Sequence, residues 1–203
     1  ESNKIDNKIS SEWLKKEIEE LKNIKNLEIK TRTSVAAYHQ YNYLLARENL
    51  TDHLEKKDKT NKIRQRLLKI RAKKVILATG ALERPMVFNN NDRPGIMLSS
   101  AIKKYSDFYG VACGRKILFF TNNDSAYESA LSLNDKGIKV EAVVDIRKQS
   151  ETNLEKRVID AGIKIYWEHT VVDTSGYKRL NNVSIMKLSN DGTSVTGNKI
   201  SIS

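Results

Sequence analysis

Residues 116–126, with the sequence KILFFTNNDSA, decide the fold of this chain. Residues 117–120 form an apolar run without alternation, which is typical of a strand buried on both faces of a parallel sheet. The sequence after this strand predicts a helix over 125–134, a strand over 140–145, a helix over 153–161 and a strand over 163–167. This alternation predicts a three-layer α/β fold, a parallel sheet with right-handed crossovers.

The turn after the first of these strands lies where a dinucleotide-binding fingerprint would be found. In the pattern G-x-G-x-x-G/A, the three defined positions are held here by Thr121, Asn123 and Ala126. The two glycines that permit a tight turn and close approach of a pyrophosphate are replaced, and only the small third residue remains. We expect a Rossmann-like fold that is preserved but no longer binds a dinucleotide tightly.

Five residues at this edge of the sheet are candidate cofactor contacts: Asn122, Asn123, Asp124, Ser125 and Asp145. Asn tolerates positive φ, so Asn122 or Asn123 is expected to make the turn. Asp124 is expected to cap the helix, where its charge disfavours a phosphate. Asp145 ends the next strand, which is the position of an acid that binds ribose hydroxyls.

A second apolar run occurs earlier, in the sequence VILATGA of residues 75–81. It predicts another strand buried on both faces. Small residues after the run allow close approach to the carboxyl end of the strand, where ligands lie in open α/β sheets. The alternative is an ordinary buried strand followed by a glycine turn.

The remaining chain predicts smaller elements, including a small antiparallel meander. In order these are a helix over 12–23 capped by Ser10 or Ser11, a strand over 27–31, strand-like residues 35–50 with a turn at 39–42, a solvated loop over 55–62, a strand over 64–71, a helix over 98–109 and a hairpin of 183–188 with 199–202.

The composition excludes several classes of protein. No apolar stretch approaches the roughly 18 residues that span a bilayer, so we expect no membrane segment. The formal net charge is +11, but the basic residues are dispersed and Lys far outnumbers Arg, so we expect no nucleic-acid partner. The single cysteine, Cys113, excludes internal disulfides and predicts a reducing, cytoplasmic location.

The histidines give no metal-binding pattern. His39, His53 and His169 have no ligand spacing with one another or with a carboxylate cluster, so we expect no metal site. Asp52 precedes His53 and is expected to form a loop hydrogen bond with it. Cys113 is expected to be a small packing residue.

The order of meander, Ala-Thr-Gly strand and second β-α-β unit resembles that of flavoprotein oxidoreductases with two dinucleotide-binding domains. A closer resemblance is to the α subunits of heterotetrameric sarcosine oxidases, from about residue 13 to at least residue 147. Four runs carry it: TDHL at 51–54, ATGALERP at 78–85, NDRPGIML at 91–98 and FTNNDSAY at 120–127. The lone cysteine excludes the disulfide chemistry of related reductases.

This resemblance implies an α subunit that binds NAD, assembled with a β subunit carrying FAD, with FMN near their junction, and with small γ and δ subunits. The implied reaction is oxidative demethylation of sarcosine to glycine, with reduction of oxygen to peroxide. The one-carbon unit leaves as formaldehyde or passes to tetrahydrofolate, which is bound elsewhere in the chain. The residues expected to border the nucleotide are Ala78, Thr79 and Gly80. Arg84 is expected to pair with a phosphate or with a carboxylate such as Asp92.

We expect the chain to be an internal segment of a longer polypeptide. We expect no catalytic residue within this segment. Residues 1–97 would end the first dinucleotide-binding domain, and residues 98–203 would be part of a second domain inserted into it. Two alternatives remain open. One is a subunit of a related amine or opine oxidase, or of a cyanide-forming glycine oxidase. The other is a non-catalytic structural subunit with a vestigial nucleotide fold.

Overall fold

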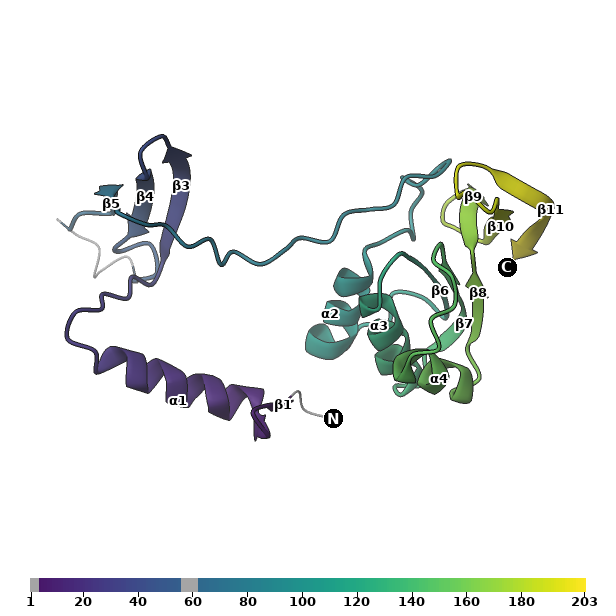
Figure 1. Ribbon diagram of the computed structural model, residues 1–203, viewed down its shortest axis with the longest axis horizontal. Helices are drawn as coiled ribbons and strands as arrows, with labels where there is room; N and C mark the ends of the chain where they lie inside the picture. The colour runs from purple at the N-terminus through teal and green to yellow at the C-terminus, as the bar shows by residue number, and fades with distance from the viewer. Residues whose placement is uncertain (1–3, 56–61) are drawn as a thin grey trace. The chain divides into compact units, whose positions relative to one another are not determined.

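The computed structural model describes residues 4–55 and 62–203. They divide into two compact units, Glu1–Thr79 and Gly80–Ser203, each described here by itself (Figure 1). Residues 80–98 belong to the second unit because they are bonded to it. The amide of Leu180 donates to the carbonyl of Pro94 at 2.7 Å, for example. The predicted boundary between two dinucleotide-binding domains, at residues 97 and 98, stays a prediction.

The first unit contains a short hairpin, one helix and an antiparallel meander. These are β1 (Lys4–Ile5), β2 (Lys8–Ile9), α1 (Ser10–Lys22), β3 (Thr33–His39), β4 (Tyr43–Asn49) and β5 (Gln65–Arg71). The meander has the strand order β3-β4-β5, as the sequence predicts. The β3–β4 turn uses two residues with positive φ, Tyr41 and Asn42. Most of the loop predicted over 55–62 lies outside the described residues.

Two local predictions in this unit are wrong. Helix α1 begins at Ser10, which places Ile9 at the N-cap position with no side-chain hydrogen bond, so neither serine caps it. No strand forms over 27–31; the amide of Leu27 bonds back to the carbonyl of Ile24 in a turn. The apolar stripe of the helix, Leu14, Ile18 and Leu21, is exposed.

The buried strand predicted at Val75–Ala78 is also not observed. Residues 73–80 form no strand, and Ile76 and Leu77 are 91% and 68% exposed. Among the described residues no strand pairs with this run. Its backbone groups therefore have no ladder to join, whatever the β preference of its side chains.

The second unit is built on a parallel sheet. After α2 (Ser99–Tyr109) come β6 (Lys116–Thr121), α3 (Ser125–Asn134), β7 (Lys139–Asp145), α4 (Asn153–Asp160) and β8 (Lys164–Trp167). The strand order is β6-β7-β8, and both pairings are parallel. These elements match the sequence prediction. Gly110 ends α2 in the left-handed conformation that helix C-termini favour.

A second, antiparallel sheet follows, with the order β11-β10-β9. Its strands are β9 (His169–Ser175), β10 (Asn182–Leu188) and β11 (Val195–Ile202). The sequence predicts the β10–β11 hairpin but not β9. Glu168 has a φ of 54°, and this single residue joins the end of β8 to the start of β9.

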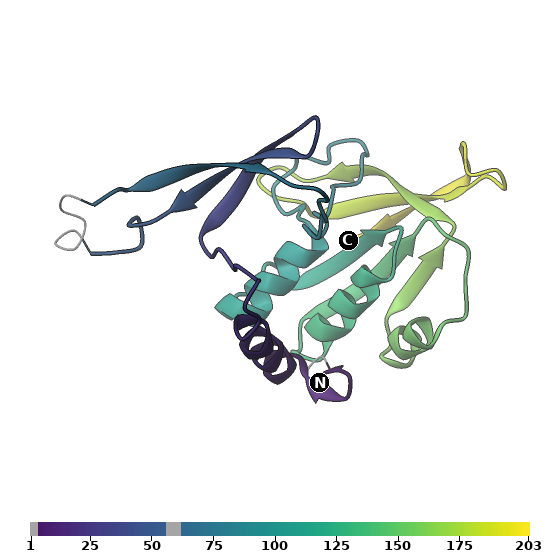
Figure 2. The same cartoon turned by 60° about the vertical axis from the view of Figure 1, so that its left-hand side comes forward.

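In the second unit helices lie on one face of the parallel sheet and the antiparallel sheet lies on the other (Figure 2). Core residues occupy both faces. One face, with Ile117 and Phe119, packs against helices α2, α3 and α4. On the other face Val144, flanked by Leu118 and Phe120, packs against Val171 of β9 and Ile185 of β10, among others. This three-layer arrangement places the carboxyl ends of β6, β7 and β8 together at one edge.

Candidate functional site at the carboxyl edge of the parallel sheet

The turn after β6 is closed by its own side chains. The Oγ1 atom of Thr121 accepts a hydrogen bond from the amide of Asn123 at 3.1 Å and donates to its carbonyl at 2.9 Å. The Oδ1 atom of Asn123 accepts from the amide and the hydroxyl of Ser125, at 3.1 and 2.6 Å. These amides are among those that would face a bound phosphate.

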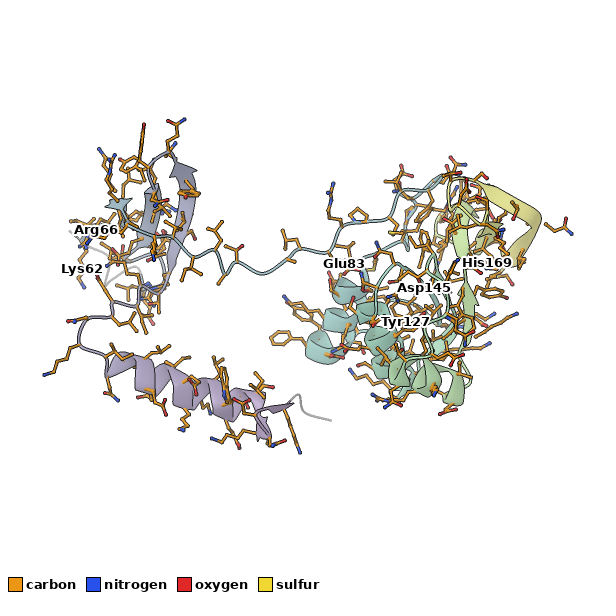
Figure 3. All side chains as sticks on the ribbon, viewed as in Figure 1. Lys62, Arg66, Glu83, Tyr127, Asp145 and His169 are labelled. Atoms are coloured by element: carbon orange, nitrogen blue, oxygen red, sulfur yellow. The ribbon has the colours of Figure 1, made fainter. Side chains whose placement is uncertain are left out.

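Asp145, at the end of β7, is the centre of a polar network. It is only 1% exposed and accepts a hydrogen bond from the Tyr127 hydroxyl at 2.8 Å (Figure 3). It also accepts from the amide of Arg147 at 2.8 Å and from the guanidinium Nη2 at 2.8 Å. The same Nη2 donates to Asp124 at 2.8 Å. One arginine therefore bridges the two acids that end the turn and the strand.

Burial and hydrogen-bonded partners shift the pKa values of two groups in this network. Burial, followed by its hydrogen bond to Asp145, raises the pKa of Tyr127 well above its ordinary value. The bonds to Asp145 and then to Asp124, against some cost of burial, raise the pKa of Arg147. Tyr127 therefore stays protonated and Arg147 stays charged at neutral pH. Buried polar groups are tolerated where hydrogen-bond donors such as these satisfy them.

The structure brings together the five candidates Asn122, Asn123, Asp124, Ser125 and Asp145, but two expected details are wrong. Neither asparagine has positive φ, so the turn forms without left-handed backbone. Asp124 makes no capping bond; Asn123 bonds the Ser125 amide in its place. The Asp124 carboxylate accepts a hydrogen bond from Arg147 instead.

Sequence reasoning missed Tyr127 and Arg147. Arg147 comes two residues after the acid that ends β7, at a place where the fingerprint allows an arginine near the ribose. That spacing could have identified Arg147 as a candidate. Tyr127 carried none, because a tyrosine in the first turn of a helix is ordinary.

The other candidates, Ala78, Thr79, Gly80 and Arg84, are exposed. Ala78 and Thr79 end the first unit, whereas Gly80 and Arg84 belong to the second. Gly80 has a φ of 71°, and a Cβ built on it would meet nothing within 4 Å. Among the described residues Arg84 has no ion pair, with Asp92 or any other acid.

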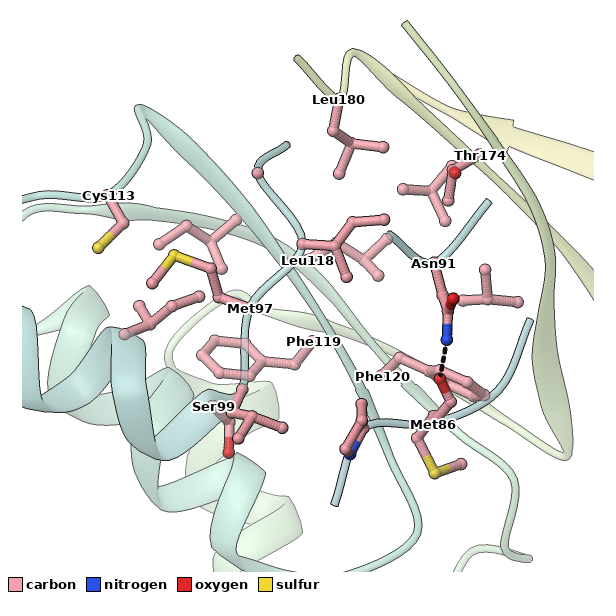
Figure 4. Close-up of a pocket in the computed structure, with 18 of the residues that line it drawn as sticks. Met86, Asn91, Met97, Ser99, Cys113, Leu118, Phe119, Phe120, Thr174 and Leu180 are labelled. Atoms are coloured by element: carbon pink, nitrogen blue, oxygen red, sulfur yellow. Dashed lines mark hydrogen bonds between the residues drawn. The ribbon is translucent and has the colours of Figure 1, made fainter. Parts of the chain in front are cut away.

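A pocket of about 480 Å³ lies in the second unit beside β6 (Figure 4). Its lining is mostly apolar and includes Met86, Met97, Phe119, Phe120 and Leu180. Asn91, on its wall, donates to the carbonyl of Met86 at 3.1 Å. Cys113 also lines the pocket and packs against the core, as a small packing residue would.

The described residues carry few other candidate sites. They hold no group of three or more His, Cys, Asp or Glu side chains placed to bind a metal ion. None of the helices in this part of the chain has the length and apolar character needed to cross a membrane. Asp52, expected to bond with His53, accepts from Arg64 at 2.6 Å and Gln65 at 3.1 Å.

Comparisons with known proteins agree with this geometry at the level of fold. No protein-family model matches the chain. Two solved structures align over most of it: L-proline dehydrogenase from P. horikoshii and an NAD-dependent persulfide reductase from A. fulgidus. The first gives a TM-score of 0.52 at 22% identity, covering 95% of this chain and 30% of that one. The second gives 0.53 at 13% identity, covering 88% and 31%. The fold is that of this group of oxidoreductases.

A curated relative extends the likeness to sequence. The α subunit of sarcosine oxidase from Corynebacterium sp. (strain P-1) is 36% identical over 189 residues, or 92% of this chain. This chain spans only 19% of that subunit. It is therefore related by sequence to the sarcosine oxidase α subunits, over a segment that makes up about a fifth of their length.

Proposed function

We propose that residues 1–203 are the nucleotide-binding scaffold of the α subunit of a sarcosine oxidase-like complex. The observation that supports this most is the 36% identity over 92% of the chain. The arrangement of β6, α3, β7, α4 and β8 adds a fold that is typical of dinucleotide-binding oxidoreductases.

The proposed reaction of the whole complex is oxidation of sarcosine. Sarcosine, oxygen and water give glycine, formaldehyde and hydrogen peroxide; with tetrahydrofolate present, the one-carbon unit is transferred to it. Oxygen accepts electrons from the CH–NH bond of the donor through flavin, as FAD and FMN in the complex. No residue of this chain is assigned to that chemistry. The proposed partners are β, γ and δ subunits, in the cytoplasm.

The residues of this chain have two proposed roles toward a nucleotide. Ala78, Thr79 and Gly80 border NAD held in the first domain, and Arg84, which has no carboxylate partner within residues 4–55 and 62–203, is available for a phosphate. The positions of Asn122–Ser125 and Asp145 correspond to a second nucleotide site. Their hydrogen bonds to one another and to Arg147 supply what a dinucleotide would otherwise provide. We therefore propose that the second position preserves the fold without tight binding.

The test is to purify the full-length complex, denature it and identify the ligands released. The proposal expects one NAD per α subunit, together with FAD and FMN, and sarcosine-dependent consumption of oxygen. Two NAD molecules per α subunit would contradict the second nucleotide role. No oxidation of any amine, with no NAD released, would favour the structural subunit instead.

A substrate panel separates the redox alternatives. Sarcosine turnover to glycine and formaldehyde supports the proposal. Cyanide from glycine, or a 2-oxo acid from an opine, would assign the chain to the corresponding related oxidase.

Matched glycine variants test the first nucleotide role. Gly80 and Gly110 both have positive φ, of 71° and 65°, and open space where a Cβ would stand. Gly80→Ala and Gly110→Ala therefore impose a similar backbone strain, of about 1 kcal/mol. Only Gly80→Ala is expected to lower the NAD content of the purified complex. Equal NAD content in the two variants would contradict this role.

A further inference from the structure

The meander of the first unit, β3, β4 and β5 (Figure 1), carries an excess of positive charge. Its strands contain one acidic residue, Glu48. Their lysines and arginines are Arg47, Arg66, Lys69 and Arg71. Glu48 is opposite Arg66 in the register and pairs with it at 3.5 Å, and its other partner is Lys30 at 3.6 Å. Three cations of the sheet are therefore left without the sheet's one acid.

These three cations, Arg47, Lys69 and Arg71, share one face of the sheet, which we call the cationic face. Residues opposite in the register share a face, and successive residues of a strand alternate between faces. The opposite pairs on this face are Tyr43–Arg71, Leu45–Lys69 and Arg47–Leu67. All three cations are exposed, and in the described part of the chain none of them has an ion pair. Lys69 is two residues from Arg71 along β5 and diagonal to Arg47 on β4, so like charges are neighbours here.

The middle of the cationic face is apolar. Leu45 lies on the middle strand, with Ala37 opposite it on β3 and Lys69 opposite it on β5. Leu45 and Ala37 are half-buried, and Leu67, at the Arg47 end of the face, is 61% exposed. An apolar centre bordered by charged side chains is the usual anatomy of an interface between proteins.

The aromatic ring in the middle strand of this face is already covered. The guanidinium carbon of Arg71 lies 5.6 Å from the centroid of the Tyr43 ring, and the His39 ring is 5.9 Å from it, centroid to centroid. Sheets that bind single-stranded nucleic acid stack bases on open aromatic rings. With Tyr43 covered and leucines beside it, the cationic face offers apolar contact and charge, which suit an acidic protein surface better than nucleic acid.

We propose that the cationic face binds an acidic surface of another subunit of the complex. Three cations without acidic partners attract carboxylates from a distance and fix the orientation of the encounter. Carboxylates from the partner also relieve the repulsion among Arg47, Lys69 and Arg71, while Leu45 and Leu67 supply apolar contact. That the partner is another subunit rests on the proposed function; that its surface is acidic rests on this face alone.

Charge reversal in the complete complex tests this proposal. The face variant is Arg47→Glu with Lys69→Glu. The matched control is Arg157→Glu with Lys156→Glu on α4, where both side chains are exposed and have no ion pair with any described residue. Sedimentation measures the dissociation constant between the full-length α subunit and the other subunits. The face variant is expected to raise it at least about 10-fold and the control less than about 2-fold.

Two further measurements keep the test independent of that one variant. Wild-type assembly is expected to weaken as salt is raised, because salt screens the attraction, and the face variant should lose this dependence. Arg47→Gln with Lys69→Gln removes the charges without reversing them, and it should give an intermediate dissociation constant. Wild-type assembly that does not respond to salt would contradict the proposal.

Several results would overturn the proposal. An unchanged dissociation constant in the face variant is one, and an equal rise in the control is another, since it would reflect net charge alone. A lower Tm of the isolated α subunit in the face variant only would assign the face to a contact within that subunit. RNA retained by the wild-type α subunit in filter binding, and lost on reversal, would assign it to nucleic acid. Absence of sarcosine-dependent oxygen consumption by the assembled wild type would overturn the proposed function and leave the dissociation constants to decide the docking.

Discussion

The two apolar runs of this chain, Val75–Ala78 and Ile117–Phe120, have similar composition and different structures. Each is four apolar residues long and is followed by a threonine. The second run lies in β6, where Phe119 is only 3% exposed. The first forms no strand, and Leu77 is 68% exposed.

The difference shows that an apolar run forms a strand only where another strand can pair with it, whatever its composition. Run 117–120 has β7 beside it, and α3 connects the two and covers the sheet. Each of these elements lies within 30 residues, as a β-α-β unit requires. Run 75–78 follows a meander whose strands pair only with one another in the described chain. Its partners must therefore come from elsewhere if it is to become a strand.

The largest expected effect comes from truncating one side chain in each run. Phe119→Ala should lower the free energy of unfolding of the second unit by about 3–5 kcal/mol, because it removes a buried ring. Leu77→Ala, at an exposed position, should change stability by less than about 0.5 kcal/mol. Denaturant unfolding of the 203-residue chain measures both. Trp167 fluorescence in a Trp13→Phe background reports the second unit, and Trp13 fluorescence in a Trp167→Phe background reports the first unit, which contains Leu77.

The same two variants, made in the full-length subunit, test whether this difference between the two runs persists there. If Leu77→Ala becomes as costly there as Phe119→Ala, run 75–78 is a core strand that acquires its partners from the rest of the polypeptide. If Leu77→Ala remains neutral there, the predicted buried strand is wrong in every context.

Two arginines give the next largest difference: Arg147, which follows β7, and Arg84, which follows run 75–78. Arg147→Ala should cost about 3 kcal/mol, because it leaves the buried Asp145 carboxylate without its charged partner. Arg84→Ala should cost nothing measurable, since Arg84 is exposed and has no ion pair within the described residues. Thermal unfolding of both variants checks this. An equal shift in Tm would show that the Arg147 bridge adds no stability.

Most of the second unit could be predicted from the sequence. The alternation of apolar runs and helical segments is local, and it gave β6, α3, β7, α4 and β8 almost to the residue. β9 was missed because its exit from the sheet depends on one residue, Glu168, with positive φ. In the first unit the strand at 75–78 was wrong for the opposite reason, since a correct local pattern lacked long-range partners.

The candidate site was predictable in position but not in bonding. Strand ends locate Asn122–Ser125 and Asp145 at one edge of the sheet, which the sequence indicates. The bridge by Arg147 depends on a side chain that reaches back to Asp145 and across to Asp124, each at 2.8 Å. No periodicity encodes such a contact.

A smaller effect is expected from Tyr127, in the first turn of α3. Tyr127→Phe should cost about 1–2 kcal/mol at neutral pH, because the buried Asp145 loses one hydrogen-bond donor. The pKa of Tyr127 is raised on folding, so its contribution is complete below about pH 10 and is lost as pH rises beyond that value. The stability difference between wild type and variant should therefore shrink as the pH is raised above 10. Tyr105→Phe, at an exposed position, is the control and should show no such trend.

The smallest effect concerns Glu83, near the start of the second unit. Burial disfavours its charge, but hydrogen bonds from Ser100 and Ser99 outweigh burial and lower its pKa. Glu83→Gln should cost about 0.5–1 kcal/mol at neutral pH, the range for losing a charged partner at a helix N-terminus. Because the folded pKa is lowered, wild type loses this contribution as pH falls below about 4.3, and the two proteins should converge in stability there. Unfolding curves at pH 7 and pH 3 measure this. A constant difference between them would mean that the Glu83 charge does not stabilise α2, and that residues 80–98 are held to the rest of their unit through Pro94 and the neighbouring loop alone.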